Sequence, residues 1–159
     1  MFKIPFDTHK PIVGKASVII NKPAADVFHF IGAQFFENYP KWAADIIEFE
    51  PLDGKEAYVG AKARQIRIDQ GKPLTSLFVI SAYQPVNYVC FKGINADYED
   101  KFVFETGSGE HSTKLTYSFE LLNVELFMRP FEKLIRLAIE DGAETTTENI
   151  KNLLSDQES

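Results

Sequence analysis

The sequence predicts an α+β fold, in which a curved antiparallel sheet of about seven strands packs against two short helices and one long C-terminal helix. Three observations predict it. Several short segments are β-branched, or alternate apolar and polar residues as strands do. Turn residues join these segments across gaps that are too short for parallel crossovers. The C-terminal segment carries apolar residues at helical spacing.

The chain length suits one domain with one core, because 159 residues lie within the usual size of a domain. We therefore predict a single domain over residues 1–159. Pro5, Pro11 and Gly14 make residues 1–14 an irregular lead-in. Residues 15–21 are apolar and β-branched and should form the first strand.

Two short helices should follow the first strand. Pro23 suits the first turn of a helix, where a missing N–H costs nothing, and Gly32 should end that helix. Residues 35–45 predict a second helix, which Pro40 should interrupt. Aromatic residues crowd this second element.

The middle of the chain predicts six further strands, at residues 46–50, 60–68, 74–83, 88–94, 101–105 and 113–121. The last of them has the clearest alternation. Leu115, Tyr117 and Phe119 share one face of that strand, and lysine, threonine and serine occupy the other. We expect the apolar face to point inward, against the long helix.

Residues 124–154 predict the long helix, and Pro130 should start its main part or kink it. One face of this helix carries Ile135, Ile139, Gly142, Thr146, Ile150 and Leu153. A glycine inside a helix costs up to about 1 kcal/mol relative to alanine. We therefore expect Gly142 to admit the close approach of a ligand or of a sheet side chain, and we place it on the side of a cavity.

Composition excludes several classes of function. The formal charge is −6 and lysine and arginine form no cluster, so nucleic acid is not an expected partner. Cys90 is the one cysteine, which excludes an internal disulfide, and we expect it to be buried. The sequence contains neither a secretory leader nor a transmembrane stretch, and this predicts a cytoplasmic protein. The three histidines lack metal-ligand spacing, so we expect no metal and no cofactor.

The order of these elements, read with particular strings, resembles the SRPBCC superfamily of START-like lipid-binding and polyketide cyclase/dehydrase proteins. The strings are SVIINKPAADVFHFI, NYPKWAADIIEFEPLDG, VGAKARQIRI, FVISAYQPVNYVCFKG, STKLTYSFEL and IEDGAETTTENIKNLL. The resemblance runs from about Lys15 to Leu154. It implies a helix-grip fold with a cavity between sheet and helix. Members of the family bind lipids, sterols, quinones, plant hormones or polyketides, and some are enzymes.

The resemblance therefore predicts binding of a small hydrophobic or amphipathic ligand, such as a lipid, a polyketide or a quinone-like molecule. Two alternatives stay open. One is an enzyme of the polyketide cyclase, aromatase or dehydratase type. The other is a quinone-binding or ribosome-associated START-like protein. The sequence leaves open the identity of the ligand, any reaction and the oligomeric state.

Candidate ligand-binding residues come from the inward faces of these elements. On residues 60–68 we expect Arg64 to point inward, because Ile66 and Ile68 share its face. A buried Tyr117 hydroxyl needs a partner, either a ligand oxygen or another protein group. No residue is assigned a catalytic role. The predicted ligand-binding residues are Phe36, Tyr39, Trp42, Arg64, Phe91, Phe102, Phe104, Tyr117, Ile135, Ile139, Gly142 and Thr146.

Overall fold

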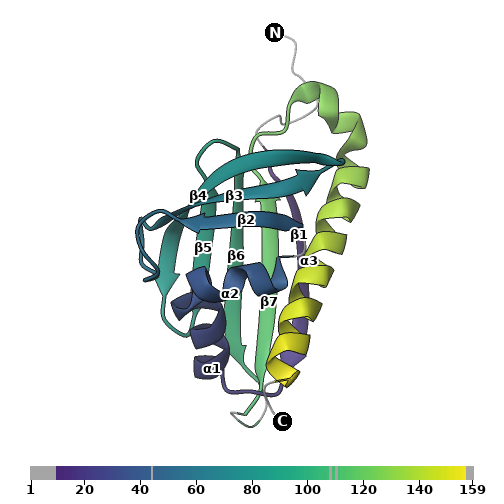
Figure 1. The fold of residues 1–159 in the computed structure, drawn as a ribbon. Helices are drawn as coiled ribbons and strands as arrows, with labels where there is room; N and C mark the ends of the chain where they lie inside the picture. Colours follow the sequence, from purple (N-terminus) through teal and green to yellow (C-terminus); the bar gives the residue numbers. More distant parts are fainter. Residues whose placement is uncertain (1–9, 44, 108, 110, 157–159) are drawn as a thin grey trace.

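The computed structural model describes residues 10–156, apart from positions 44, 108 and 110, and its architecture confirms the predicted fold (Figure 1). A seven-stranded antiparallel sheet has the order β1-β7-β6-β5-β4-β3-β2, so the first two strands of the chain form its two edges. The strands are β1 (Ile12–Ile20), β2 (Ile46–Pro51), β3 (Lys62–Asp69), β4 (Lys72–Gln84), β5 (Tyr88–Gly93), β6 (Tyr98–Thr106) and β7 (Thr113–Leu121).

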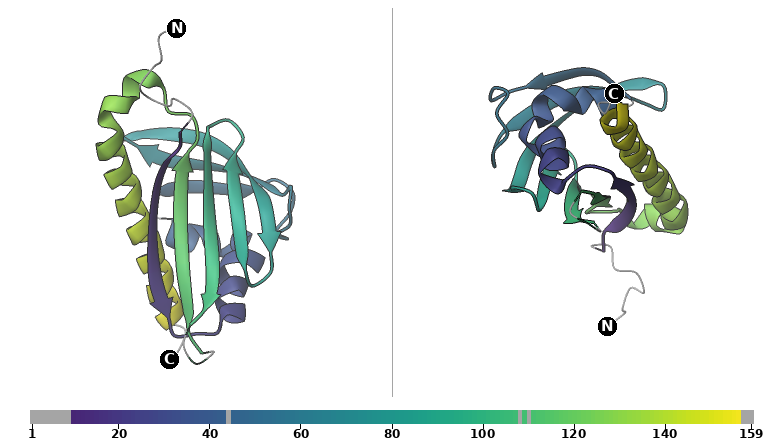
Figure 2. Two further views of the ribbon diagram at one scale, coloured as in Figure 1. Left: turned by 180° about the vertical axis from the view of Figure 1, so that it is seen from behind. Right: turned by 90° about the horizontal axis from the view of Figure 1, so that it is seen from below.

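The helical segments lie inside the curve of the sheet and along its open side. They are α1 (Ala24–Phe28), the π-helical turn η1 (His29–Ala33), α2 (Phe35–Trp42), the 3-10 turn η2 (Leu126–Phe131) and α3 (Glu132–Asp156). Figure 2 shows the sheet curling around α1 and α2, and α3 running beside β1. Helix α3 packs mainly on β1 and also contacts β7 and α2. No helix of the described part of the chain is long and apolar enough to cross a membrane.

Two predicted boundaries differ from the structure. Strand β1 begins at Ile12, so the irregular lead-in is shorter than predicted; residues 1–9 of that lead-in lie outside the described residues. Gly14 belongs to the strand, and α3 crosses the strand at this position. A Cβ here would lie 2.6 Å from Ile139 Cγ2, so the crossing needs a glycine. Helix α2 continues through Pro40 instead of breaking. The aromatic residues around Pro40 pack on the core, and this packing offsets the hydrogen bond that proline cannot donate.

The core is mainly aromatic and lies between the sheet and the two short helices. Phe35 of α2 is at its centre, and its ring lies 4.3 Å from that of Phe91 and 4.9 Å from that of Tyr39, centroid to centroid. Strand β7 has the predicted orientation: Leu115 is fully buried, and the Tyr117 ring lies 4.6 Å from that of Phe102. The period-two pattern of β7 therefore predicted its inward face correctly.

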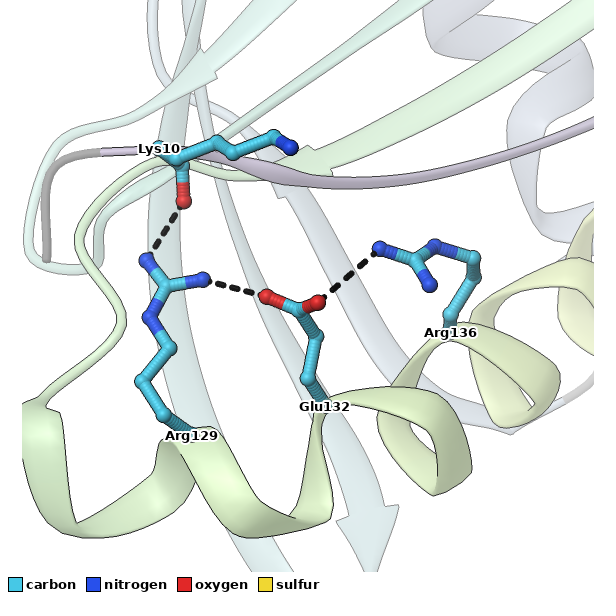
Figure 3. A network of polar contacts seen from close by, with 4 residues as sticks. All are labelled: Lys10, Arg129, Glu132 and Arg136. Carbon is cyan, nitrogen blue, oxygen red and sulfur yellow. Dashed lines mark hydrogen bonds and ion pairs between the residues drawn. The ribbon is translucent and has the colours of Figure 1, made fainter. Parts of the chain in front are cut away.

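A buried arginine fixes the start of α3 (Figure 3). Arg129 Nη2 donates a hydrogen bond to the carbonyl oxygen of Lys10, and Arg129 Nη1 donates to Glu132 Oε1, both at 2.6 Å. Glu132 Oε2 also accepts a hydrogen bond from Arg136, at 3.4 Å. This network joins the beginning of the long helix to the chain that leads into β1.

The predicted apolar stripe of α3 is only partly right. The fully buried residues of this helix are Ala143, Thr147, Ile150 and Leu154. The predicted stripe is rotated around the helix relative to this face. The spacing rule finds apolar side chains, but Ala143 and Thr147 are small or polar, and they pack here because β1 approaches closely.

Candidate functional site

Polar side chains interrupt the concave face of the sheet next to the aromatic core. On β6, Asp100 shares the inward face with Phe102 and Phe104, because side chains alternate along a strand. The Tyr117 hydroxyl on neighbouring β7 donates a hydrogen bond to Asp100 Oδ2, at 2.8 Å. A carboxyl group therefore lies inside the curve of the sheet, with its partner fixed by the strand register.

The environment of Asp100 changes its acidity. Its pKa is raised from 3.8 to about 7. Burial is the largest cause and Glu99 acts in the same direction, whereas the hydrogen bond from Tyr117, a backbone hydrogen bond and the charge of Arg67 lower the pKa. Removing a carboxylate from water favours the neutral acid, and this effect outweighs the three that favour the anion. Near neutral pH the Asp100 carboxyl can therefore hold or release a proton.

A second polar chain crosses the same face. The Tyr39 hydroxyl, from α2, donates a hydrogen bond to Gln65 Oε1 at 2.8 Å, and Gln65 Nε2 donates to Ser76 Oγ at 3.1 Å. Burial raises the pKa of Tyr39, Tyr98 and Tyr117 above the usual tyrosine value. These phenols therefore stay protonated at neutral pH and can donate hydrogen bonds.

Arg67 brings a positive charge to this face. It follows Gln65 by two residues on β3, so both side chains leave the strand on the concave side. Its charge lowers the pKa of Asp100, Tyr98 and Tyr39. Strands β3 and β6 are separated by two strands in the sheet. The curvature of the sheet therefore brings Arg67 toward groups that a flat sheet would keep apart.

The inward-facing side chains are fully buried under α1 and α2 but only partly buried toward the first half of α3. Leu115 is fully buried, whereas Tyr117 and Phe119, further along the same face of β7, are partly exposed. The partly buried residues are Tyr98, Asp100, Tyr117 and Phe119 of the sheet and Ile135, Ile139 and Thr146 of α3. We use the name groove for the predicted cavity between these two sets.

Five predicted ligand-binding residues belong to the solid aromatic core. Their side chains are at most 4% exposed and their rings contact one another or neighbouring aromatic rings: Phe36, Trp42, Phe91, Phe102 and Phe104. Tyr39 and Tyr117 are partly buried and contribute hydroxyl groups to the polar cluster.

The predicted orientation of Arg64 is wrong. Arg64 Nη2 lies 2.9 Å from Glu50 Oε2 and 3.2 Å from Glu48 Oε1, on the face of β3 opposite to Gln65. These hydrogen bonds raise the pKa of Arg64. The prediction assumes that Ile66 and Ile68 mark the inward face of this strand. Ile66 is only partly buried and Ile68 is 40% exposed, so that face points outward. The arginine on the concave side is Arg67.

The residues predicted on α3 are less buried than those of the aromatic core. Ile135, Ile139 and Thr146 are partly buried, and Gly142 is exposed. A Cβ at Gly142 would contact nothing within 4 Å, so the close approach of a sheet side chain is not the reason for this glycine. Asn149, two helical turns further on, donates a hydrogen bond to the Trp42 carbonyl oxygen at 3.1 Å, so this face of α3 looks toward α2.

Two hollows lie elsewhere on the surface. One, of about 440 Å³, is bordered by Lys22, His29, Glu37, Lys41 and neighbouring residues of α1, η1 and α2. The other, of about 330 Å³, lies at the turn between β3 and β4. Neither is the predicted cavity between the sheet and the stripe of α3, and that cavity stays a prediction.

Sequence reasoning missed four polar residues of the concave face: Gln65, Arg67, Tyr98 and Asp100. A signal existed for Asp100, because it stands two positions before Phe102 on an otherwise aromatic strand face. A charged residue at such a position is unusual and marks a candidate site. Arg67 gave no comparable signal, because the strand could have been read in either phase.

Comparisons with known proteins give the fold but no close relative. No family model and no curated protein matches the sequence. The protein TTHA0849 from Thermus thermophilus superposes with a TM-score of 0.73 at 18% identity, over 92% of this chain and 99% of its own. The Zhui aromatase/cyclase from Streptomyces sp. R1128 gives 0.75 at 10% identity, over 94% of this chain and 97% of its own. Norcoclaurine synthase from Thalictrum flavum, solved with dopamine and hydroxybenzaldehyde, gives 0.74 at 14% identity, over 96% of this chain and 91% of its own.

Proposed function

We propose that this chain, which has the helix-grip fold of the SRPBCC superfamily, binds a small amphipathic molecule in the groove. The observation that carries the proposal is the partial exposure of inward-facing side chains beside a cluster of hydroxyl and charged groups. Apolar walls with a few polar anchors are the usual form of a ligand site. The ligand is a lipid, a polyketide or a quinone-like molecule, and the protein acts in the cytoplasm.

The ligand lies with its apolar body between two walls. One wall is the ring of Phe119, which stacks on Tyr98 at 5.3 Å. The other consists of Ile135 and Ile139 on α3. Its polar end lies toward Asp100. Two fold neighbours support a small-molecule role by analogy, since one was solved with two small aromatic molecules and the other is an aromatase/cyclase.

A groove-filling variant tests the proposal. Titration with the neutral dye Nile red should give a saturable rise in fluorescence, because the dye leaves water for an apolar site. Gly142→Leu should weaken this binding at least about tenfold, because the added side chain enters the groove, and the variant should stay folded since leucine favours a helix more than glycine.

The matched control is Glu148→Leu, which adds a leucine at an exposed position of the same helix. This variant should bind the dye as the unchanged protein does. An absence of saturable binding by the unchanged protein contradicts the proposal. Equal binding by both leucine variants contradicts the placement of the ligand beside Gly142.

A second candidate function is catalysis of proton transfer in the same groove. The observation that favours it is the Asp100 carboxyl, which has a pKa of about 7 and holds a 2.8 Å hydrogen bond from the Tyr117 hydroxyl. A group that titrates near the working pH is suited to act as a general base or acid. The reaction would be of the cyclase, aromatase or dehydratase type.

A further inference from the structure

Strand β3 carries two arginines that have opposite surroundings. Arg64 is paired twice, with Glu48 and Glu50 of the neighbouring edge strand β2. Arg67 is exposed, and within the described residues its guanidinium has neither a hydrogen-bond nor an ion-pair partner. The first arginine is therefore satisfied by the protein, whereas the second has all its donors available.

The immediate neighbours of Arg67 across the sheet are apolar. In the register, Arg67 is opposite Ile46 on β2 and opposite Leu74 on β4. An arginine at this place can lay its long apolar stem along the isoleucine and the leucine. Its charged end then projects beyond this apolar surface. The guanidinium therefore lies where the apolar wall meets solvent.

The polar groups facing Arg67 across the curve are few. The Tyr39 hydroxyl donates a hydrogen bond to Gln65, and the Tyr117 hydroxyl donates one to Asp100, so both donors are occupied. The Tyr98 hydroxyl has no hydrogen-bond partner in the described part of the chain. Arg67 and Tyr98 are thus two donors of the concave face that lack acceptors.

We propose that Arg67 is the anchor for a carboxylate on the ligand, with Tyr98 as a second donor, so that the groove selects apolar molecules that carry one carboxylate. This inference rests on the proposed function, because it specifies the ligand of the same groove. A guanidinium binds a carboxylate through two parallel N–H···O bonds, and this geometry makes the pairing specific.

The charge balance of the face favours a singly charged group. Asp100 is the acidic residue of the concave polar cluster, and at neutral pH its burial keeps it partly protonated. A doubly charged phosphate would meet this carboxyl with only one arginine to compensate. A carboxylate has one charge and two acceptor oxygens, which match one guanidinium and one phenol.

A pair of probes separates the contribution of the Arg67 anchor to binding from that of the apolar groove. 11-(Dansylamino)undecanoic acid and its methyl ester share one apolar body and differ only in the carboxylate. Fluorescence titration at pH 7.5 should show the acid binding about tenfold or more tightly than the ester. In Arg67→Gln the preference should fall to within about twofold, and Arg67→Lys should restore part of it.

Arg64→Gln is the matched control, because it removes one positive charge from the same strand on the other face. It should keep the preference for the acid. An equal loss in both glutamine variants would mean that net charge and not the anchor decides, and this overturns the proposal. Circular dichroism should show Arg67→Gln folded, since the Arg67 side chain has no hydrogen bond or ion pair with the described residues. If the variant does unfold, Arg67→Lys alone still decides, because loss of the preference for the acid in that variant overturns the anchor.

Two other results separate the two proposals. If the acid and the ester bind the unchanged protein equally well, the anchor is wrong and the ligand-binding function stands. If neither probe binds and Nile red does not bind, the function itself is wrong and the anchor falls with it.

Discussion

At the scale of single residues, Asp100 combines features that a purely structural carboxyl lacks. Its hydrogen bond from Tyr117 fixes the orientation of one oxygen, and it remains partly exposed on the concave face. The groups around it are Tyr39 from α2, Arg67 from β3, Tyr98 and Glu99 from β6, and Tyr117 from β7. Only one of these groups is a cation, so burial decides the acidity of Asp100.

Such a carboxyl should act as a general base on a carbonyl compound in the groove. In heavy water, the unchanged protein should speed the incorporation of deuterium into the methyl group of 4-hydroxyacetophenone. In this step the methyl C–H bond breaks, Asp100 takes the proton, and the electron pair moves to the carbonyl oxygen. We expect an acceleration of at least about a hundredfold over buffer, the lower range for a positioned base, followed by NMR.

Asp100→Asn should lose this acceleration, because an amide does not accept the proton. Tyr117→Phe should keep part of it, since the carboxyl remains. If the unchanged protein and Asp100→Asn exchange deuterium at the same rate, Asp100 is not a base for this class of carbonyl compound. The enzymatic candidate would then lose the observation that favours it.

The same scale shows where sequence reasoning succeeds and fails. The alternation of β7 predicted the inward orientation of Tyr117, because every second residue of that strand is apolar. On β3 the alternation is weak, and the isoleucines lie on the face that also carries Arg64. The phase of β3 is set instead by Gln65, whose amide is bound by Tyr39 and Ser76. Such partners come from distant segments, so a local pattern could not reveal them.

At the scale of elements, the contact between β1 and α3 depends on a glycine. A Cβ at Gly14 would lie 2.6 Å from Ile139 Cγ2 and 2.8 Å from the backbone nitrogen of Glu140. Backbone nitrogen cannot move without moving the helix. Gly14 is therefore a position at which the long helix approaches the sheet closely.

Two alanine variants should separate this contact from helix propensity. Gly14→Ala should lower the free energy of unfolding by about 1–3 kcal/mol, because it overpacks the crossing of β1 and α3. Gly142→Ala should raise it by up to about 1 kcal/mol, because its Cβ enters open space and alanine favours a helix. Urea unfolding followed by circular dichroism measures both. A Gly14→Ala variant as stable as the unchanged protein would show that the helix is not seated on this glycine.

Element boundaries were predictable where one segment decides them and not where two segments meet. Strand β7 has the bounds that the alternation predicts, residues 113–121. Strand β1 begins earlier than predicted, because Gly14 breaks an isolated strand but fits under a helix. The buried face of α3 differs for the same reason, since α3 packs mainly on β1 and its buried face includes Ala143 and Thr147, which are small or polar. In each case the missing information is the contact between two elements.

At the scale of the whole molecule, the curvature of the sheet creates the candidate site. The order of elements and the family resemblance predict this sheet, and the structure confirms it. They do not predict which polar groups the curve brings together, because Arg67 and Asp100 lie on strands that are not neighbours. The site is therefore a property of the closed fold, and its energetic effect should appear in the stability of the whole domain.

That effect has a definite sign with pH. The pKa of Asp100 is about 7 in the folded protein and near 3.8, its ordinary value, in the unfolded chain. Between these values the folded state binds more protons, so the contribution of Asp100 to stability is fully present below pH 3.8 and is lost as the pH rises through 7. The full pKa shift corresponds to a change of roughly 4 kcal/mol in the free energy of unfolding, as an upper bound. The buried tyrosines have raised pKa values and do not titrate in this window.

Asp100→Asn should remove this dependence, because an asparagine side chain stays neutral and its oxygen can still accept the hydrogen bond from Tyr117. We expect the variant and the unchanged protein to have similar free energies of unfolding at pH 4.5, and the variant to be more stable by about 1–4 kcal/mol at pH 8.5. Urea unfolding at a series of pH values measures the difference in free energy of unfolding between the variant and the unchanged protein. The titration of all other groups cancels in this difference. A difference that does not grow between pH 5 and pH 8 would show that Asp100 titrates as an ordinary, solvated carboxyl. The acid–base role and the charge argument for a carboxylate ligand would then both lose their support, whereas the groove and the unpaired Arg67 would remain.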